Sequence, residues 1–180
     1  MPYPIRVTGS TVVLREFCMQ DVDDVLAIIG DDKVTTWLSF DSRDRDQAVA
    51  MIEGTLERAR QEPRTEFYLG VTKRDEDRVI GFARIGLSGV QAGKLGYAIA
   101  AKEWGRGYAT DAARALVTYA FKDLGLHRIT AAIGPDNIAS IAVVQQLGFT
   151  REGALRDHVF TNGQWRDSVL FSVLAHEWSW

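Results

Sequence analysis

The stretch KEWGRGYAT, residues 102–110, stands where an apolar strand pattern ends and a helical pattern begins. It places Gly105 and Gly107 on either side of Arg106. A turn of this kind leaves the first backbone N–H groups of the helix without partners inside the helix. Those groups and the helix dipole together attract an anion. The stretch therefore predicts an anion site at the start of a helix.

Several interpretations of this turn compete. In one, it is a tight connection whose glycines relieve crowding of the backbone. A dinucleotide-binding turn of a nicotinamide oxidoreductase would carry a third glycine where Thr110 stands, and it would follow a parallel strand. A phosphate-transferring loop would carry GxxxxGK[ST], which the sequence lacks. A pyrophosphate cradle over residues 105–110 suits the glycines, because phosphate can then reach the main chain without meeting a Cβ.

The composition indicates one soluble globular domain over residues 1–180, since 46% of the residues are apolar and 25% are charged. The net charge of −3 and the absence of a Lys/Arg run argue against a nucleic-acid partner. No apolar run approaches the roughly 20 residues of a membrane span. Cys18 is the only cysteine, which suits a reducing cytoplasm. We expect a cytoplasmic protein without membrane contact.

The apolar patterns predict an α/β (α+β) fold with an antiparallel first half and one β-α-β crossover. The Asn-Gly pair in TNGQ predicts a hairpin turn between the last two strands. Residues 33–44 are expected to form a loop. The expected helices cover residues 22–29, 46–61, 108–124 and 137–147. The expected strands cover residues 11–16, 65–73, 78–87, 94–100, 127–133, 149–160 and 164–174.

The glycine turn resembles the acetyl-coenzyme A motif of the GCN5-related N-acetyltransferases (GNAT), Gln/Arg-x-x-Gly-x-Gly/Ala, with Trp104 at the first position. That substitution is familiar in the branch resembling ribosomal-protein N-terminal alanine/serine acetyltransferases. The resemblance extends to VVLREF, RVIGFARIGL, DNIASIAVVQQLGFTREGALRD and HVFTNGQWRDSVLFSVL. It implies a GNAT fold with a mixed sheet of about seven strands, a splayed parallel pair and about four helices. It also implies acetyl-CoA as co-substrate, no metal, and an amine acceptor, and it leaves a homodimer open.

The resemblance assigns the site as follows. The pantetheine arm of acetyl-CoA lies between strands 94–100 and 127–133, where it pairs with exposed backbone groups. The diphosphate lies on the cradle, and the thioester points toward helix 137–147. The cofactor-binding residues implied in this way are Ile99, Ala100, Ala101, Gly105, Arg106, Gly107, Tyr108, Ala109, Thr110 and Asn137.

Asn137 and Ser140 have two interpretations. Asn before a helix is most often a cap, and Ser is tolerated in a first turn. With the resemblance, Asp136 caps the helix, Asn137 contacts pantetheine or a water molecule, and Ser140 is the catalytic residue that stabilises the leaving thiolate. Many family members carry a Tyr for this role, but the aligned residue here is Val144.

Glu103, Asp157 and His158 are the candidates for the base that accepts the proton of the amine, and the sequence does not choose among them. An α-amine, with a pKa of roughly 7.7–8.0, needs a weaker base than a lysine amine near 10.4. A protein N-terminal α-amine is therefore favoured as acceptor. The alternatives are a small-molecule amine or a non-catalytic acyl-CoA-binding module. The resemblance places the acceptor pocket between loop 33–44, with Trp37, and the final hairpin.

Overall fold

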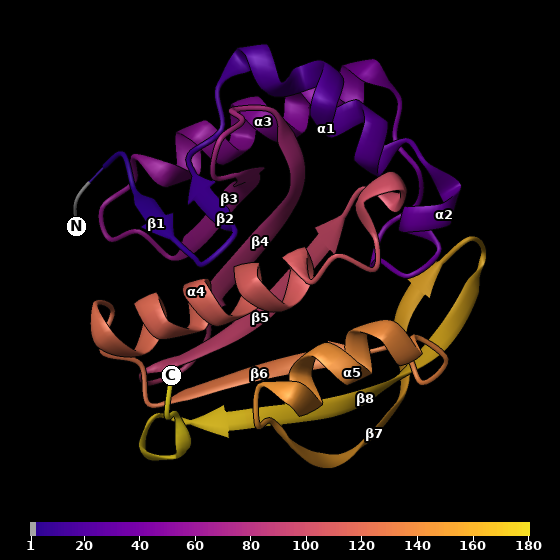
Figure 1. Cartoon of the computed structure of the whole chain (residues 1–180). Coiled ribbons are helices and arrows are strands. Elements are labelled where there is room, and N and C mark those ends of the chain that lie inside the picture. The colour runs from indigo at the N-terminus through magenta and orange to yellow at the C-terminus, as the bar shows by residue number, and fades with distance from the viewer. Residues whose placement is uncertain (1–2) are drawn as a thin grey trace.

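The computed structural model describes residues 3–180, and its strands form one mixed sheet in the order β1-β2-β3-β4-β5-β6-β8-β7 (Figure 1). The expected α/β architecture is confirmed. The elements in chain order are β1 (Arg6–Thr8), β2 (Val12–Arg15), η1 (Met19–Asp21), α1 (Val22–Ile29), α2 (Asp32–Thr35), α3 (Arg45–Ala59), β3 (Glu66–Lys73), β4 (Val79–Leu87), β5 (Ala92–Ile99), η2 (Ala101–Glu103), α4 (Tyr108–Lys122), β6 (Arg128–Ile133), α5 (Ile138–Gln146), β7 (Thr150–Thr161), β8 (Gln164–Leu174) and η3 (Ala175–Glu177).

Helices cover both faces of the sheet, and each face has its own hydrophobic core (Figure 1). Successive side chains of a strand point to opposite faces. On β3, Phe67 and Leu69 belong to the core beneath α4 and α5, whereas Tyr68 belongs to the core beneath α1 and α3. The central strands are therefore buried on both sides, which explains their almost continuous apolar sequence.

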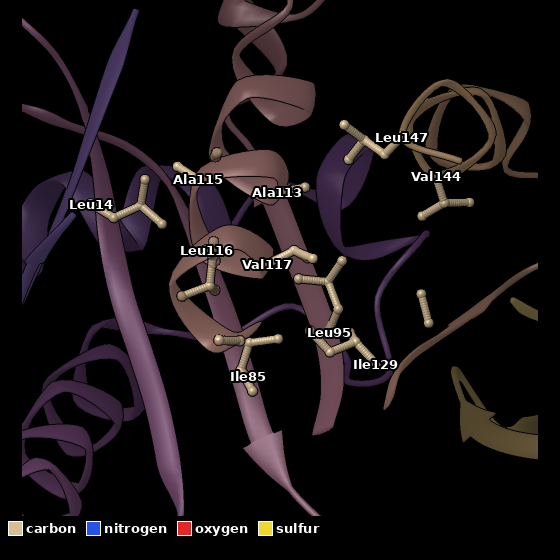
Figure 2. Packing of buried hydrophobic residues seen from close by; sticks show 14 of the residues in the cluster. Leu14, Ile85, Leu95, Ala113, Ala115, Leu116, Val117, Ile129, Val144 and Leu147 are labelled. Carbon is tan, nitrogen blue, oxygen red and sulfur yellow. The ribbon is translucent and has the colours of Figure 1, made fainter. Parts of the chain in front are cut away.

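Helix α4 packs closely on the sheet because its buried face is built largely from alanine, including Ala112 and Ala113, which are fully buried. In Figure 2, Leu116 and Val117 of α4 are directed toward sheet residues that include Leu95. Small residues that alternate with Leu and Val let the helix approach the strands without leaving a void. This packing fixes the helix whose first turn carries the glycine stretch.

Strands β5 and β6 form the parallel pair at the centre of the sheet, and they separate partway along their length. They are paired at Ala92↔Arg128, Gly93↔Ile129 and Lys94↔Thr130, and no pairing follows. β5 then continues to Ile99 against β4, while β6 continues against β8. The edges of β5 and β6 that face each other beyond these pairs lack a strand partner.

The structure adds short elements that the sequence patterns do not predict, namely β1, α2 and the 3-10 helices η1, η2 and η3. β1 is only three residues long, and α2 is a four-residue helix, Asp32–Thr35, that overlaps the start of the expected loop 33–44. The predicted hairpin turn is confirmed, with positive φ at Asn162 and Gly163. Among residues 3–180, none of the helices combines the length and apolar character that a membrane crossing requires.

Candidate active site

The glycine turn leads into the first turn of α4. Gly105 and Gly107 have φ of +74° and +79°, in the left-handed region that disfavours other residues. A Cβ built on either glycine would meet no heavy atom within 4 Å, so the backbone is not crowded there. This excludes crowding as the reason for the glycines. Within residues 3–180, no side chain caps α4 at Gly107, and its first amides need an acceptor from outside the helix.

An ion-pair network holds the arginine of this turn. Arg106 Nη1 lies 3.1 Å from Oε2 of Glu103, and Lys73 Nζ lies 3.3 Å from Oε1 of the same carboxylate. Glu103 is buried, whereas Arg106 is exposed. Burial alone would lower the pKa of Lys73, but its interaction with Glu103 raises it. Glu103 therefore anchors two cations beside residues 105–110, which we call the cradle.

Trp104 is hydrogen-bonded to the last residue of β5, next to the cradle. Its indole Nε1 donates a hydrogen bond of 2.7 Å to the carbonyl oxygen of Ile99. The next residue, Ala100, donates its backbone N–H to Ile80 O of β4 at 2.8 Å. The chain then turns into η2 at Ala101. The edge of β5 that faces the splay therefore ends at Ile99.

One cleft of about 1550 Å³ runs from the cradle through the splay to the opposite face of the sheet. Ala100 and Ala101 do not line it. They line a separate cavity of about 130 Å³ between α1 and β4. The other predicted cofactor-binding and catalytic residues line the large cleft, namely Ile99, Gly105, Arg106, Gly107, Tyr108, Ala109, Thr110, Asn137 and Ser140.

The first turn of α5 presents Ser140 to the cleft. Asn137 is the N-cap, and its Oδ1 accepts the Ser140 N–H at 3.2 Å, so the expectation that Asp136 caps the helix is wrong. Tyr97 of β5 donates its phenol to the Ser140 carbonyl oxygen at 3.0 Å. Burial raises the pKa of Tyr97 far above its ordinary value, so the phenol stays protonated. Both backbone groups of Ser140 are thus held in place.

The three candidate bases occupy different surroundings. Glu103 lines the cleft but is paired with two cations. Asp157 is exposed, does not line the cleft, and has φ of +46° in an irregular stretch of β7. Pairing with β8 shifts register between Leu155 and Val159, and this bulge contains His158. His158 lines the cleft, and its Nδ1 lies 2.9 Å from Ser168 Oγ.

The loop that follows α2 lies near the tip of the β7–β8 hairpin (Figure 1), and residues of both segments line the cleft. Arg166 of β8 donates to the carbonyl oxygens of Thr36 and Leu38, both at 2.6 Å. The loop residues Trp37 and Phe40 line the cleft between these contacts and α3. At the hairpin turn, the Asn162 N–H also donates to Oδ1 of Asp41 at 2.8 Å, so hydrogen bonds connect the loop and the hairpin that were predicted to flank an acceptor.

Comparison with known proteins identifies the family. The profile described as an acetyltransferase (GNAT) domain matches residues 11–150. The chain belongs to the GNAT acetyltransferase family. Over 177 residues it is 31% identical to the uncharacterized N-acetyltransferase YoaA of Bacillus subtilis (strain 168), covering 96% of this chain and 97% of YoaA. It is 34% identical over 116 residues to the [ribosomal protein uS5]-alanine N-acetyltransferase of Escherichia coli (strain K12), covering 63% and 60% of the chains.

Solved structures share this GNAT fold. RimJ of Mycobacterium smegmatis, in complex with CoA-disulfide, superimposes with a TM-score of 0.85 at 25% identity, covering 97% of this chain and 90% of that one. A GNAT acetyltransferase from Bacillus anthracis gives a TM-score of 0.84 at 21% identity, covering 96% and 100%. The predicted family and branch are confirmed, and the protein is an acetyltransferase.

Two residues that position the GNAT site, Tyr97 and Asp111, have no local signal in the sequence. Tyr97 reads as an ordinary strand residue, because its partner on α5 lies 43 positions away. Asp111, in the first turn of α4, accepts the backbone N–H groups of Ser10, Thr11 and Val12 at 3.0, 2.6 and 3.1 Å. Asp111 thereby fixes the cradle helix to the loop before β2.

Asp111 gives this acetyltransferase a testable pH dependence. Burial alone would raise the pKa of Asp111, but the hydrogen bonds from Thr11 and Ser10 lower it below its ordinary value. A lowered pKa in the folded state stabilises the protein above the unfolded pKa of about 3.9, and this stability is lost as pH falls through the folded pKa. We expect Asp111→Asn to cost about 2 kcal/mol at pH 7, with the cost shrinking below about pH 4.

Denaturant unfolding of both proteins at several pH values measures this cost. The matched control is Asp46→Asn, which changes an exposed aspartate in the first turn of α3. It should change the free energy of unfolding by less than about 0.5 kcal/mol. An Asp111→Asn cost that stays constant down to pH 3 would contradict the assignment.

Proposed function

We propose that this GNAT acetyltransferase transfers the acetyl group of acetyl-CoA directly to the N-terminal α-amine of a protein or peptide. The observation that carries the proposal is the shared cleft, into which both the β5–β6 splay and the cradle open. We treat residues 1–180 as one domain, because β1 and β8 belong to the same sheet. The lone Cys18 suits a reaction in the cytoplasm.

The residues of the cleft fit the parts of coenzyme A. Two left-handed glycines line the cleft at the start of α4 with open space around their Cβ positions, which suits a diphosphate. Arg106 supplies a positive charge beside them. The unpaired edges of β5 and β6 offer backbone groups to the two amides of a pantetheine arm. Asn137 and Ser140 then lie at the sulfur end of the arm.

The proposed acetyl transfer needs two groups from this chain: one that donates a hydrogen bond to the leaving sulfur and one that accepts the proton of the amine. When bound, acetyl-CoA supplies an acetyl group activated as a thioester. Ser140 Oγ donates a hydrogen bond at the sulfur, and Tyr97 and Asn137 hold the Ser140 backbone. His158 serves as the proton acceptor: with Nδ1–H donated to Ser168, its Nε2 keeps a lone pair for the amine proton.

An α-amine acceptor is consistent with a histidine as the proton acceptor. Its pKa, roughly 7.7–8.0, leaves a useful neutral fraction at pH 7, whereas a lysine amine near 10.4 would need a stronger base. The Escherichia coli relative is named as an alanine N-acetyltransferase of ribosomal protein uS5, which supports a protein acceptor. The proposal is tested by a mass-spectrometric screen of peptides with varied first residues against a panel of small amines. Acetylation of small amines alone would contradict it.

Replacing Ser140 separates catalysis from binding. We expect Ser140→Ala to leave the Kd for acetyl-CoA within about twofold of wild type and to lower kcat by about 10- to 100-fold. Calorimetry gives the first quantity, and thiol release during acetylation gives the second. Ser88→Ala, outside the cleft, is the control and should change neither. Equal losses of binding and turnover would show that Ser140 only holds coenzyme A.

A further inference from the structure

The far end of the cleft is rich in positive charge that acetyl transfer does not require. Register places Tyr68, Arg84 and Gly96 side by side, so their side-chain positions share the sheet face covered by α1 and α3. Four cationic side chains line the cleft away from the cradle: Arg43, Arg58, Arg84 and Lys94. The acidic residues that line the cleft, Glu103 and Asp136, follow β5 and precede α5, at the coenzyme A end.

One carboxylate is shared between two of these arginines. Arg58 Nε lies 2.6 Å from Oε2 of Glu66, and Arg84 Nε donates to Oε1 of the same side chain. A single negative charge between two guanidinium groups leaves one positive charge in excess. Because Arg58 and Arg84 remain about half exposed, with 44% and 49% of their side-chain surface accessible, both still present donors to the cleft.

Arg43 has no carboxylate partner anywhere in residues 3–180. Its guanidinium carbon lies 4.1 Å from the centre of the Phe40 ring. Stacking on an aromatic face holds a guanidinium in one orientation and leaves the N–H donors in its plane available. The Arg43 guanidinium is therefore held in one orientation without a carboxylate partner among residues 3–180. Its N–H groups can donate two parallel hydrogen bonds to the two oxygens of a carboxylate.

The buried phenol of Tyr68 is influenced by two of these arginines. Burial raises the pKa of the Tyr68 phenol, while the positive charges of Arg84 and Arg43 act on it in the opposite direction. Arg84 comes from β4, and its guanidinium carbon lies 6.0 Å from the centre of the Tyr68 ring. Arg43 comes from the loop before α3 and lines the same cleft, so two separate elements contribute positive charge to the cleft wall that includes Tyr68.

We propose that the acceptor amine carries a carboxylate near the amine, and that Arg43 binds this carboxylate while Arg84 adds positive charge in the same cleft. The inference rests on the acetyl transfer from acetyl-CoA proposed above, because it concerns the acceptor of that reaction, whether a peptide or a small amine. The carboxylate can be an Asp or Glu side chain close to a peptide N-terminus, or the α-carboxylate of a free amino acid. A polyamine would meet charges of its own sign and bind poorly.

Matched acceptors test the inference. Peptides with Glu in their second and third positions are compared with the same peptides carrying Gln, and free amino acids are compared with their carboxamides. In the acid–amide pair that resembles the natural acceptor, we expect kcat/KM to be at least 10-fold higher for the acid than for the amide. This preference should shrink as the salt concentration increases. The acid–amide pair that shows the larger preference identifies that acceptor.

Replacing Arg43 tests the residue assignment. In Arg43→Gln the acid–amide ratio should fall toward 1, because kcat/KM for the acid acceptors drops far more than kcat/KM for the amide acceptors. The control is Arg45→Gln, which removes an exposed arginine paired with Asp23 outside the cleft. Equal use of acids and amides by the wild type, or a preference for spermidine, would overturn the inference and leave acetyl transfer standing. Failure to bind acetyl-CoA would instead overturn the proposed function.

Discussion

Replacing Gly107 by alanine is expected to weaken acetyl-CoA binding by at least about 30-fold, or about 2 kcal/mol. Among residues 3–180, apart from the two chain neighbours of Gly107, no heavy atom lies within 4 Å of the added Cβ, so the protein itself leaves room for it. The substitution would add a methyl group to the cradle, which lines the cleft and on which we place the diphosphate. Hydrogen bonds to a charged group contribute about 1.5–3 kcal/mol each, so the loss of one or two gives this effect. Isothermal calorimetry measures it.

Gly125 provides a matched control, because it also has a positive φ, +65°, and open space around its Cβ position. It lies beyond the other end of α4 and does not line the cleft. Gly125→Ala should destabilise the fold as much as Gly107→Ala does, by about 1–2 kcal/mol from backbone strain, and leave the Kd unchanged. Equal Kd values in both variants would contradict the role of the cradle.

Removing the Glu16 carboxylate is expected to lower the free energy of unfolding by about 3–5 kcal/mol. Arg64 donates to both carboxylate oxygens of Glu16, at 2.7 and 3.2 Å, and both side chains are at least 94% buried. Glu16→Leu would leave the Arg64 guanidinium buried without its counter-ion. Urea unfolding measures the loss, and a loss below about 1 kcal/mol would contradict the burial of this pair.

A double replacement distinguishes the unpaired charge from a loss of packing. Glu16→Leu with Arg64→Met should recover most of the lost stability, because neither charge is then buried. The exposed pair of Arg45 and Asp23 serves as the comparison, and Arg45→Gln should cost less than about 1 kcal/mol. A double variant no more stable than Glu16→Leu alone would show that shape complementarity, not charge, dominates at this position.

Much of the fold could be predicted because its signals are local. Apolar periodicity identified the long strands and α4, and the Asn-Gly turn gave the final hairpin. β1 escaped prediction because a three-residue strand is too short to show a period. Helix α2 lies in a polar stretch, and Asp31 at its N-cap is a local signal that could have revealed it, since its side chain accepts the Lys33 N–H.

The site was predictable where it depends on chain order and unpredictable where distant segments meet. The glycine turn and the first turn of α5 are contiguous motifs, so they can be located from the sequence. The orientation of His158 depends on a bulge that has no periodic signal. Arg43, Arg58 and Arg84 look like ordinary surface charges, because their convergence follows from the pairing of β3 with β4 and the packing of α3.

A crystal structure of the protein soaked with coenzyme A measures the central contact directly. We expect the diphosphate oxygens to accept backbone N–H groups of residues 105–110 at about 2.7–3.2 Å, with the pantetheine arm between β5 and β6 beyond Lys94. Coenzyme A bound elsewhere, with those amides facing only water or protein, would contradict the assignment of this site.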